Sequence, residues 1–145
     1  MINLSYTINW PENNSLHVFG SLQDLTPLFQ VNGSIDLLIN EICISLVSGT
    51  ILVDLIQIIN ALSEISISRY EGKILPITFD DETRLTVYYS DYLLISDISN
   101  PPKTENISLE EAVDFSSNLA KRALKDIETN APFIVSLFQD RIKLS

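Results

Sequence analysis

Apolar and polar residues alternate strictly from Ile2 to Asn9, which predicts a strand with one buried face. Pro11 interrupts the pattern, and a second short strand is expected at residues 16–19. The first twenty residues therefore favour extended structure over helix.

The dipeptide Asn32-Gly33 is the strongest local turn signal, because two-residue hairpin turns require positive φ at both positions. It predicts a hairpin between residues 28–31 and 34–39. A weaker turn at Asn40-Glu41 precedes another alternating segment, residues 42–47. Together these segments predict a three-stranded antiparallel meander.

The hydrophobic period changes from two to that of a helix after Gly49. Five apolar side chains then share one helical face: Ile51, Leu55, Ile58, Ile59 and Leu62. The opposite face is expected to carry the residues Asp54, Gln57, Ala61 and Glu64. The pattern predicts a helix over residues 51–62 that packs on the sheet and exposes its polar face.

Three further strands are expected at residues 73–79, 84–89 and 92–98, joined by the acidic turn Asp80-Asp81-Glu82 and by the tight turn Ser90-Asp91. Turns this short can return a strand only antiparallel to its neighbour.

The dipeptide Pro101-Pro102 lies in a stiff connector to the last segment of the chain. Ser108 and Glu111 then form a capping-box pattern, which predicts the start of a long helix. A short helix is expected at residues 131–142. The predicted fold is α+β in a single domain, residues 1–145: an antiparallel sheet of meanders and hairpins, packed by two main helices and a short C-terminal helix.

The charge distribution limits the classes of partner. No lysine or arginine precedes Arg69, and the chain of 145 residues has a net charge of −10. Binding to nucleic acid is disfavoured, because phosphate contacts require basic side chains. Asp54 and several polar residues interrupt the apolar stretch at residues 42–63, which argues against a transmembrane span. We expect a soluble cytoplasmic protein.

The sequence contains no phosphate-binding loop, dinucleotide fingerprint or nucleophile elbow. The single histidine, His17, is expected to be a structural or a solvated residue, and the single cysteine, Cys43, is expected to be buried. One histidine and one cysteine cannot supply a usual zinc ligand set. We therefore expect no metal, no cofactor and no catalytic residue, and hence a protein that is not an enzyme.

Three tyrosines and an acidic residue lie close to the acidic turn in the sequence. Exposed tyrosines are enriched among binding hot spots, although tyrosines are also ordinary strand residues. We expect this stretch to bind a partner protein through Asp80, Asp81, Glu82, Tyr88, Asp91 and Tyr92.

The hairpin segment NGSIDLLINEICISL, the helix ILVDLIQIINAL, the strand pair RLTVYYSDYLLIS and the helix ISLEEAVDFSSNLAKRAL share a pattern with one family type. Over residues 28–129 the chain resembles bacterial immunity proteins of contact-dependent growth inhibition and related polymorphic toxin systems. The resemblance implies a stoichiometric inhibitor that binds the toxin domain of its cognate effector, with no catalytic residue to carry over.

An acidic partner would be steered towards a basic toxin domain such as a nuclease, which fits this resemblance. The alternative is an acidic secretion chaperone that binds an effector protein. Such chaperones usually open with an amphipathic helix, whereas this sequence opens with a strand pattern. An enzyme that uses carboxylates alone is a third and weaker alternative, because no motif pairs the acids.

Overall fold

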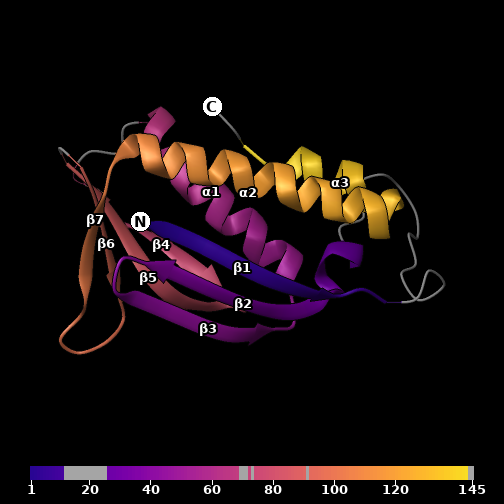
Figure 1. Ribbon diagram of the computed structural model, residues 1–145, viewed down its shortest axis with the longest axis horizontal. Coiled ribbons are helices and arrows are strands. Elements are labelled where there is room, and N and C mark those ends of the chain that lie inside the picture. Colours follow the sequence, from indigo (N-terminus) through magenta and orange to yellow (C-terminus); the bar gives the residue numbers. More distant parts are fainter. Residues whose placement is uncertain (12–25, 69–71, 73, 91, 144–145) are drawn as a thin grey trace.

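The computed structural model describes residues 1–11, 26–68, 72, 74–90 and 92–143. Two antiparallel sheets and a group of helices form the architecture (Figure 1). The first sheet has the order β1-β2-β3, formed by β1 (Ile2–Asn9), β2 (Asn32–Ile39) and β3 (Ile42–Ser48). The second has the order β4-β5-β6-β7, formed by β4 (Ile74–Phe79), β5 (Glu82–Tyr89), β6 (Leu93–Asp97) and β7 (Thr104–Ile107). The predicted α+β class is confirmed.

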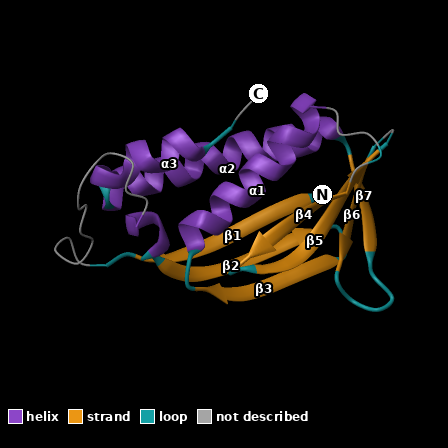
Figure 2. Ribbon diagram, turned by 180° about the vertical axis from the view of Figure 1, so that it is seen from behind, coloured by secondary structure: helices purple, strands orange, loops and turns teal. Residues whose placement is uncertain are grey.

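The helices lie together on one side of the strands, as the views from opposite directions show (Figures 1 and 2). They are α1 (Ile51–Ser68), α2 (Leu109–Asn130) and α3 (Val135–Arg141), with short 3-10 helices η1 (Thr26–Phe29) and η2 (Pro132–Ile134). One hydrophobic cluster unites residues from both sheets and all three α-helices. Within the described parts of the chain, no helix combines the length and the hydrophobicity needed to cross a membrane.

Helix α1 forms where the helical period predicted it and continues beyond residue 62 to Ser68. The five residues of its predicted apolar face are all buried, which confirms that prediction. The prediction for Asp54 is wrong, because its side chain is 1% exposed. Its carboxylate accepts hydrogen bonds from groups outside the helix, and these partners compensate for its removal from water.

Helix α2 begins at the predicted capping box, where the Ser108 hydroxyl accepts the Glu111 N–H at 3.1 Å. Its buried face consists mainly of small residues, which allow α2 to approach α1 closely: Ala112, Ser116, Leu119, Ala120, Ala123 and Ile127.

The prediction of a hairpin turn at Asn32-Gly33 is wrong. Both residues belong to β2, which pairs with β1 through Gly33 and Ile8 instead of with residues 28–31. A Cβ atom at Gly33 would lie 2.1 Å from the carbonyl oxygen of Thr7 and 2.7 Å from Cδ1 of Ile51. Glycine is therefore required there for close packing, not for a turn.

The hairpin turn with positive φ at both central positions occurs instead at Asp80 (φ 51°) and Asp81 (φ 65°), between the paired residues Phe79 and Glu82. Aspartate tolerates this backbone region better than most residues. The strands β4, β5 and β6 confirm the second predicted meander, whereas β7 was not predicted. The strand expected at residues 16–19 lies outside the described residues.

Each sheet buries one face and exposes the other. On β3 the register places Ile42 opposite Ile39 and turns Cys43 outwards, so the prediction of a buried thiol is wrong. The outer face of the first sheet carries no lysine or arginine; it consists of Asn3, Ser5, Thr7, Asn9, Asn32, Ser34, Asp36, Leu38, Cys43, Ser45 and Val47.

Candidate functional site

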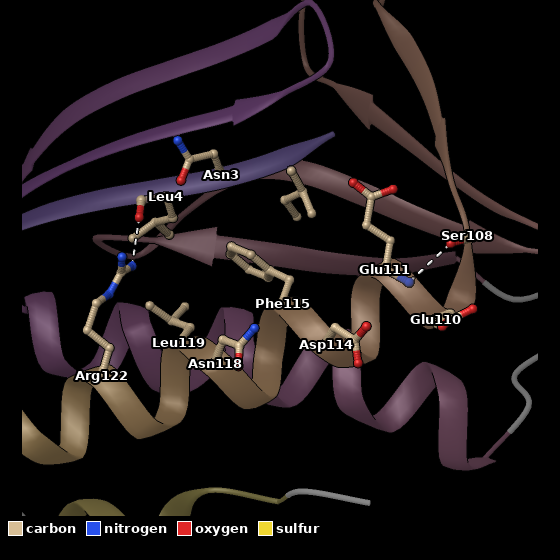
Figure 3. A pocket seen from close by; sticks show the side chains of 11 residues that line it. Asn3, Leu4, Ser108, Glu110, Glu111, Asp114, Phe115, Asn118, Leu119 and Arg122 are labelled. Carbon is tan, nitrogen blue, oxygen red and sulfur yellow. Dashed lines mark hydrogen bonds between the residues drawn. The ribbon is translucent and has the colours of Figure 1, made fainter.

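A groove of about 550 Å³ lies between β1 and the first half of α2 (Figure 3). Its apolar lining comes from Ile2, Leu4, Phe115 and Leu119. The alternation of β1 and the amphipathic face of α2 direct these side chains towards each other. The groove therefore offers a surface of mixed polarity between a strand and a helix.

Three carboxylates line one end of the groove: Glu110, Glu111 and Asp114. They lie in the first turns of α2, where the partial positive charge of the helix N-terminus stabilises negative side chains. Within the described residues, neither Glu110 nor Asp114 forms an ion pair, so both can accept donors from a partner.

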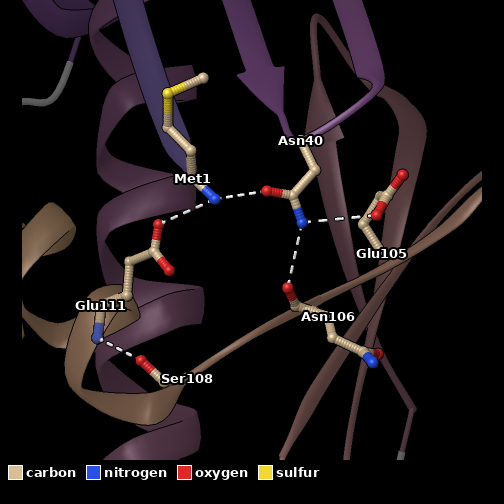
Figure 4. Close-up of polar contacts among 6 residues, drawn as sticks. All are labelled: Met1, Asn40, Glu105, Asn106, Ser108 and Glu111. Carbon is tan, nitrogen blue, oxygen red and sulfur yellow. Dashed lines mark hydrogen bonds and ion pairs between the residues drawn. The ribbon is translucent and has the colours of Figure 1, made fainter.

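Glu111 belongs to a polar network that joins this end of the groove to both sheets (Figure 4). Its carboxylate lies 3.2 Å from the amino group of Met1, which also donates to the side-chain oxygen of Asn40. The amide nitrogen of Asn40 donates to the carbonyl oxygen of Asn106 at 3.1 Å and to the carboxylate of Glu105 at 3.4 Å. The β2–β3 turn is thereby held against β7.

Arg122 lies at the other end of the groove, where its guanidinium contacts β1. Its guanidinium donates to the carbonyl oxygen of Leu4 at 2.7 Å and lies 5.0 Å from the centre of the Tyr6 ring. The Tyr6 hydroxyl donates to the Asp126 carboxylate. Burial, and then this hydrogen bond, raise the pKa of Tyr6, so the phenol stays protonated. The groove lining contains three carboxylates and one guanidinium, so its net charge is negative, and the carboxylates lie at the Glu110 end.

The residues predicted to bind a partner do not form one cluster. Asp80, Asp81 and Glu82 lie at one end of β5, and Tyr88 lies near the other end. At about 3.3 Å per residue, the six steps from Glu82 to Tyr88 separate them by roughly 20 Å. Tyr92 follows the β5–β6 turn at the Tyr88 end, and Asp91 lies outside the described residues.

Two residues of the acidic turn are bound to other parts of the protein. Asp80 accepts the Gly49 N–H at 3.3 Å, and its own N–H donates to Asp54 at 3.0 Å. Glu82 forms an ion pair with Arg84 at 2.8 Å. Asp80, Asp81 and Glu82 are all exposed, and within the described residues the Asp81 carboxylate has no such contact.

Tyr88 lies on the outer face of the second sheet, on the opposite face from the buried Leu85 and Val87. Its neighbours across the sheet are Ile74, which is 66% exposed, and Leu94. This small apolar patch and the acidic turn are two separate surfaces.

No local pattern in the sequence predicts the groove, because its two walls are far apart in the chain. The hydrogen bond that closes it joins residues 118 positions apart. In the sequence, the acids of α2 follow the capping box at Ser108, which predicts the start of a helix and not a binding site. No group of three or more histidine, cysteine, aspartate or glutamate side chains in the described segments could hold a metal ion.

Comparison with protein-family models, with curated proteins and with solved structures gave no match.

Proposed function

We propose that this protein is the immunity protein of a bacterial polymorphic toxin system. It binds the basic toxin domain of its cognate effector in the cytoplasm and inhibits it stoichiometrically, without catalysis. The observation that supports this proposal best is the groove between β1 and α2, which combines an apolar lining with three carboxylates at one end.

The composition of the groove fits a basic segment of a partner protein. The apolar lining can bury an anchor side chain, and the acids at one end can accept hydrogen bonds from lysine or arginine of the partner. Charge-assisted bonds of this kind give register and specificity, whereas the buried apolar contact slows dissociation.

The net charge of −10 supports the same partner class. A toxin domain that cleaves RNA or DNA needs a basic surface, and an acidic inhibitor is attracted to that surface over a distance. Long-range attraction raises the association rate and weakens as salt screens the charges.

Two triple variants with the same change of net charge separate local contact from long-range attraction. Glu110→Gln, Glu111→Gln and Asp114→Asn remove the charges of the groove. Asp80→Asn, Asp81→Asn and Glu82→Gln remove those of the acidic turn and serve as the matched control. Asparagine also tolerates the positive φ of positions 80 and 81.

The partner for this experiment is the toxin domain encoded by the reading frame next to this gene. We expect the groove variant to lose at least tenfold in affinity and to stop protecting cells that express the toxin. The turn variant should only lower the association rate and flatten its salt dependence. Circular dichroism checks that both variants fold.

Equal affinity of the groove variant and the parent protein would refute the role of the groove. A larger loss from the turn variant, or from Tyr88→Ala or Tyr92→Ala, would place the interface on the second sheet. If the partner is bound but keeps its full toxicity, the protein is a chaperone for that effector and the proposed inhibition is wrong.

A further inference from the structure

The four outer strands of the two sheets differ in how their free edges are protected. Natural sheets block their edges with proline, bulges, short strands or covering side chains, because a free edge can pair with another chain. Strand β4 has Pro76 and an irregular register between Ile77 and Thr78. Strand β7 has only four residues, and the side-chain amide of Asn40 donates a hydrogen bond to the carbonyl oxygen of Asn106.

Strand β1 is covered by Arg122, which occupies the carbonyl oxygen of Leu4. Among the described residues, nothing of this kind protects strand β3. It runs for seven residues without a proline, a charged side chain or a break in its register. In Figures 1 and 2, no other described element lies beyond it. It is the one unprotected edge among the described strands.

The hydrogen-bond pattern shows which groups face this edge. The backbone N–H of Asn40 donates to the carbonyl oxygen of Met1, so by alternation Leu4 and its partner Leu37 are not a hydrogen-bonded pair of β1 and β2. The backbone groups of Leu37 therefore point to β3, where Ile44 is its partner. Because the direction alternates, the backbone N–H and C=O groups of Cys43, Ser45 and Val47 point away from β2. All three residues are exposed, Val47 to 80%.

We propose that two copies of this protein associate through β3, which pairs antiparallel with β3 of the second copy around a twofold axis at Ser45. The two first sheets then form one continuous sheet of six strands. Cys43 lies opposite Val47 of the second copy, and Ile44 lies opposite its Leu46. Each position of one strand thus meets a small or apolar residue of the other.

The charges near β3 are compatible with this register although both copies are acidic. Glu41, the charged residue next to the strand, lies opposite Gly49 of the second copy, so the two Glu41 side chains are at opposite ends of the pair. The nearest charge on the adjacent strand is Asp36, which pairs with Ser45. The two Asp36 residues are three strand spacings apart, roughly 14 Å, which exceeds the screening length at physiological salt.

The contact is small, which determines how strong the association can be. Seven paired residues provide about six backbone hydrogen bonds but bury less than the roughly 800 Å² per partner of a standard stable interface. The dimer should therefore be in rapid, concentration-dependent equilibrium with the monomer. Added salt should strengthen it, because the overall charges of the two copies repel each other.

A disulfide crosslink tests the register directly. In a Cys43→Ser background, Ser45→Cys places two thiols opposite each other across the twofold axis. The Cα atoms of a hydrogen-bonded antiparallel pair are about 5.5 Å apart, within the range of disulfide geometry. Ser5→Cys in the same background is the matched control, since Ser5 lies in the same row of the outer face but on β1.

Under mild oxidation we expect the Ser45→Cys variant to form covalent dimers and the Ser5→Cys variant to stay largely monomeric. Equal crosslinking of the two variants, or crosslinking of neither, would overturn the proposal. The groove between β1 and α2 is not part of this interface, so the result of the crosslinking experiment is independent of the proposed function.

Sedimentation over a range of concentrations tests the association without a crosslink. The mass of the parent protein should rise from 16.3 kDa towards twice that value. Val47→Glu should weaken dimerisation at least tenfold, because the new carboxylate lies near Glu41 of the second copy. Thr7→Glu, which adds the same charge in the same row on β1, should leave it within about twofold. A parent protein that stays monomeric at every concentration, or equal effects of both substitutions, would refute the β3 interface.

Discussion

The Asp54 carboxylate in α1 accepts the backbone N–H of Asp80 in the β4–β5 turn at 3.0 Å. It also accepts the hydroxyl of Ser48 at the end of β3 and that of Thr50 before the helix. One buried side chain thus connects the first sheet, the helix and the second sheet.

The variant Asp54→Asn should change how stability depends on pH. Burial, aided by the negative charge of Asp80, raises the pKa of Asp54, although the hydrogen bonds from Ser48, Asp80 and Thr50 act against the shift. The folded state therefore binds this proton more tightly than the unfolded state. The contribution to stability is present at low pH and is lost as pH rises through the raised pKa.

The difference in unfolding free energy between parent and Asp54→Asn should consequently shift in favour of the parent as the pH falls from about 7.5 to about 4. Urea denaturation at several pH values measures it. Asp140→Asn, at an exposed site, gives the baseline for the loss of one charge. A difference that stays constant, or that shifts towards the variant, would contradict the prediction.

Gly33→Ala should destabilise the protein by about 3 kcal/mol, because the new methyl group must displace the backbone of Thr7 and the side chain of Ile51. Gly49→Ala is the control. The nearest atom to a Cβ at Gly49 is 3.6 Å away, an ordinary contact, so its effect should stay within about 0.5 kcal/mol. Chemical denaturation measures the unfolding free energy of both variants. Similar losses of stability would show that β1 and β2 do not approach as closely as described at Gly33.

Leu55→Ala should lower the unfolding free energy by about 2–5 kcal/mol, because it leaves a cavity where α1 packs into the common core. The exposed Gln57 on the same helix provides the matched site, and Gln57→Ala should change stability by less than about 0.5 kcal/mol. If Leu55→Ala changes the denaturation midpoint no more than Gln57→Ala does, α1 is rotated relative to this structure.

Cys43 should react with a thiol reagent in the native protein. Its side chain is exposed on the outer face of β3, so labelling requires no unfolding. In dilute native solution the reaction should reach one label per chain at a rate within about tenfold of that in denaturant, because an exposed site needs no opening step. Protection by several orders of magnitude in dilute solution would show that the thiol is buried.

The elements that could be predicted from the sequence are those with strong local signals. The apolar stripe around Leu55 and the capping box at Ser108 require only neighbours in the chain, and both are confirmed. The turn signal at Gly33 was misleading because the same residue also satisfies a steric requirement of a strand pair, and only the pairing of β1 with β2 shows this. Strand β7 has four residues, too few for a clear alternation.

The candidate site could not be predicted because it depends on contacts between distant segments. The groove needs β1 and α2 side by side, and Asp54 finds partners at the end of β3 and in the β4–β5 turn. The acidic turn and Tyr88 are near each other in the sequence but not in space. They lie at opposite ends of the extended strand β5.

The absence of lysine and arginine from the outer face of the first sheet limits the reagents that can report on it. Trypsin and amine-reactive crosslinkers find no side chain to attack there. A footprint of a bound partner or second copy obtained with such reagents would leave this face blank even if it were fully covered. Thiol chemistry at Cys43 and carboxyl chemistry at Asp36 provide the labels by which occupancy of this face can be detected.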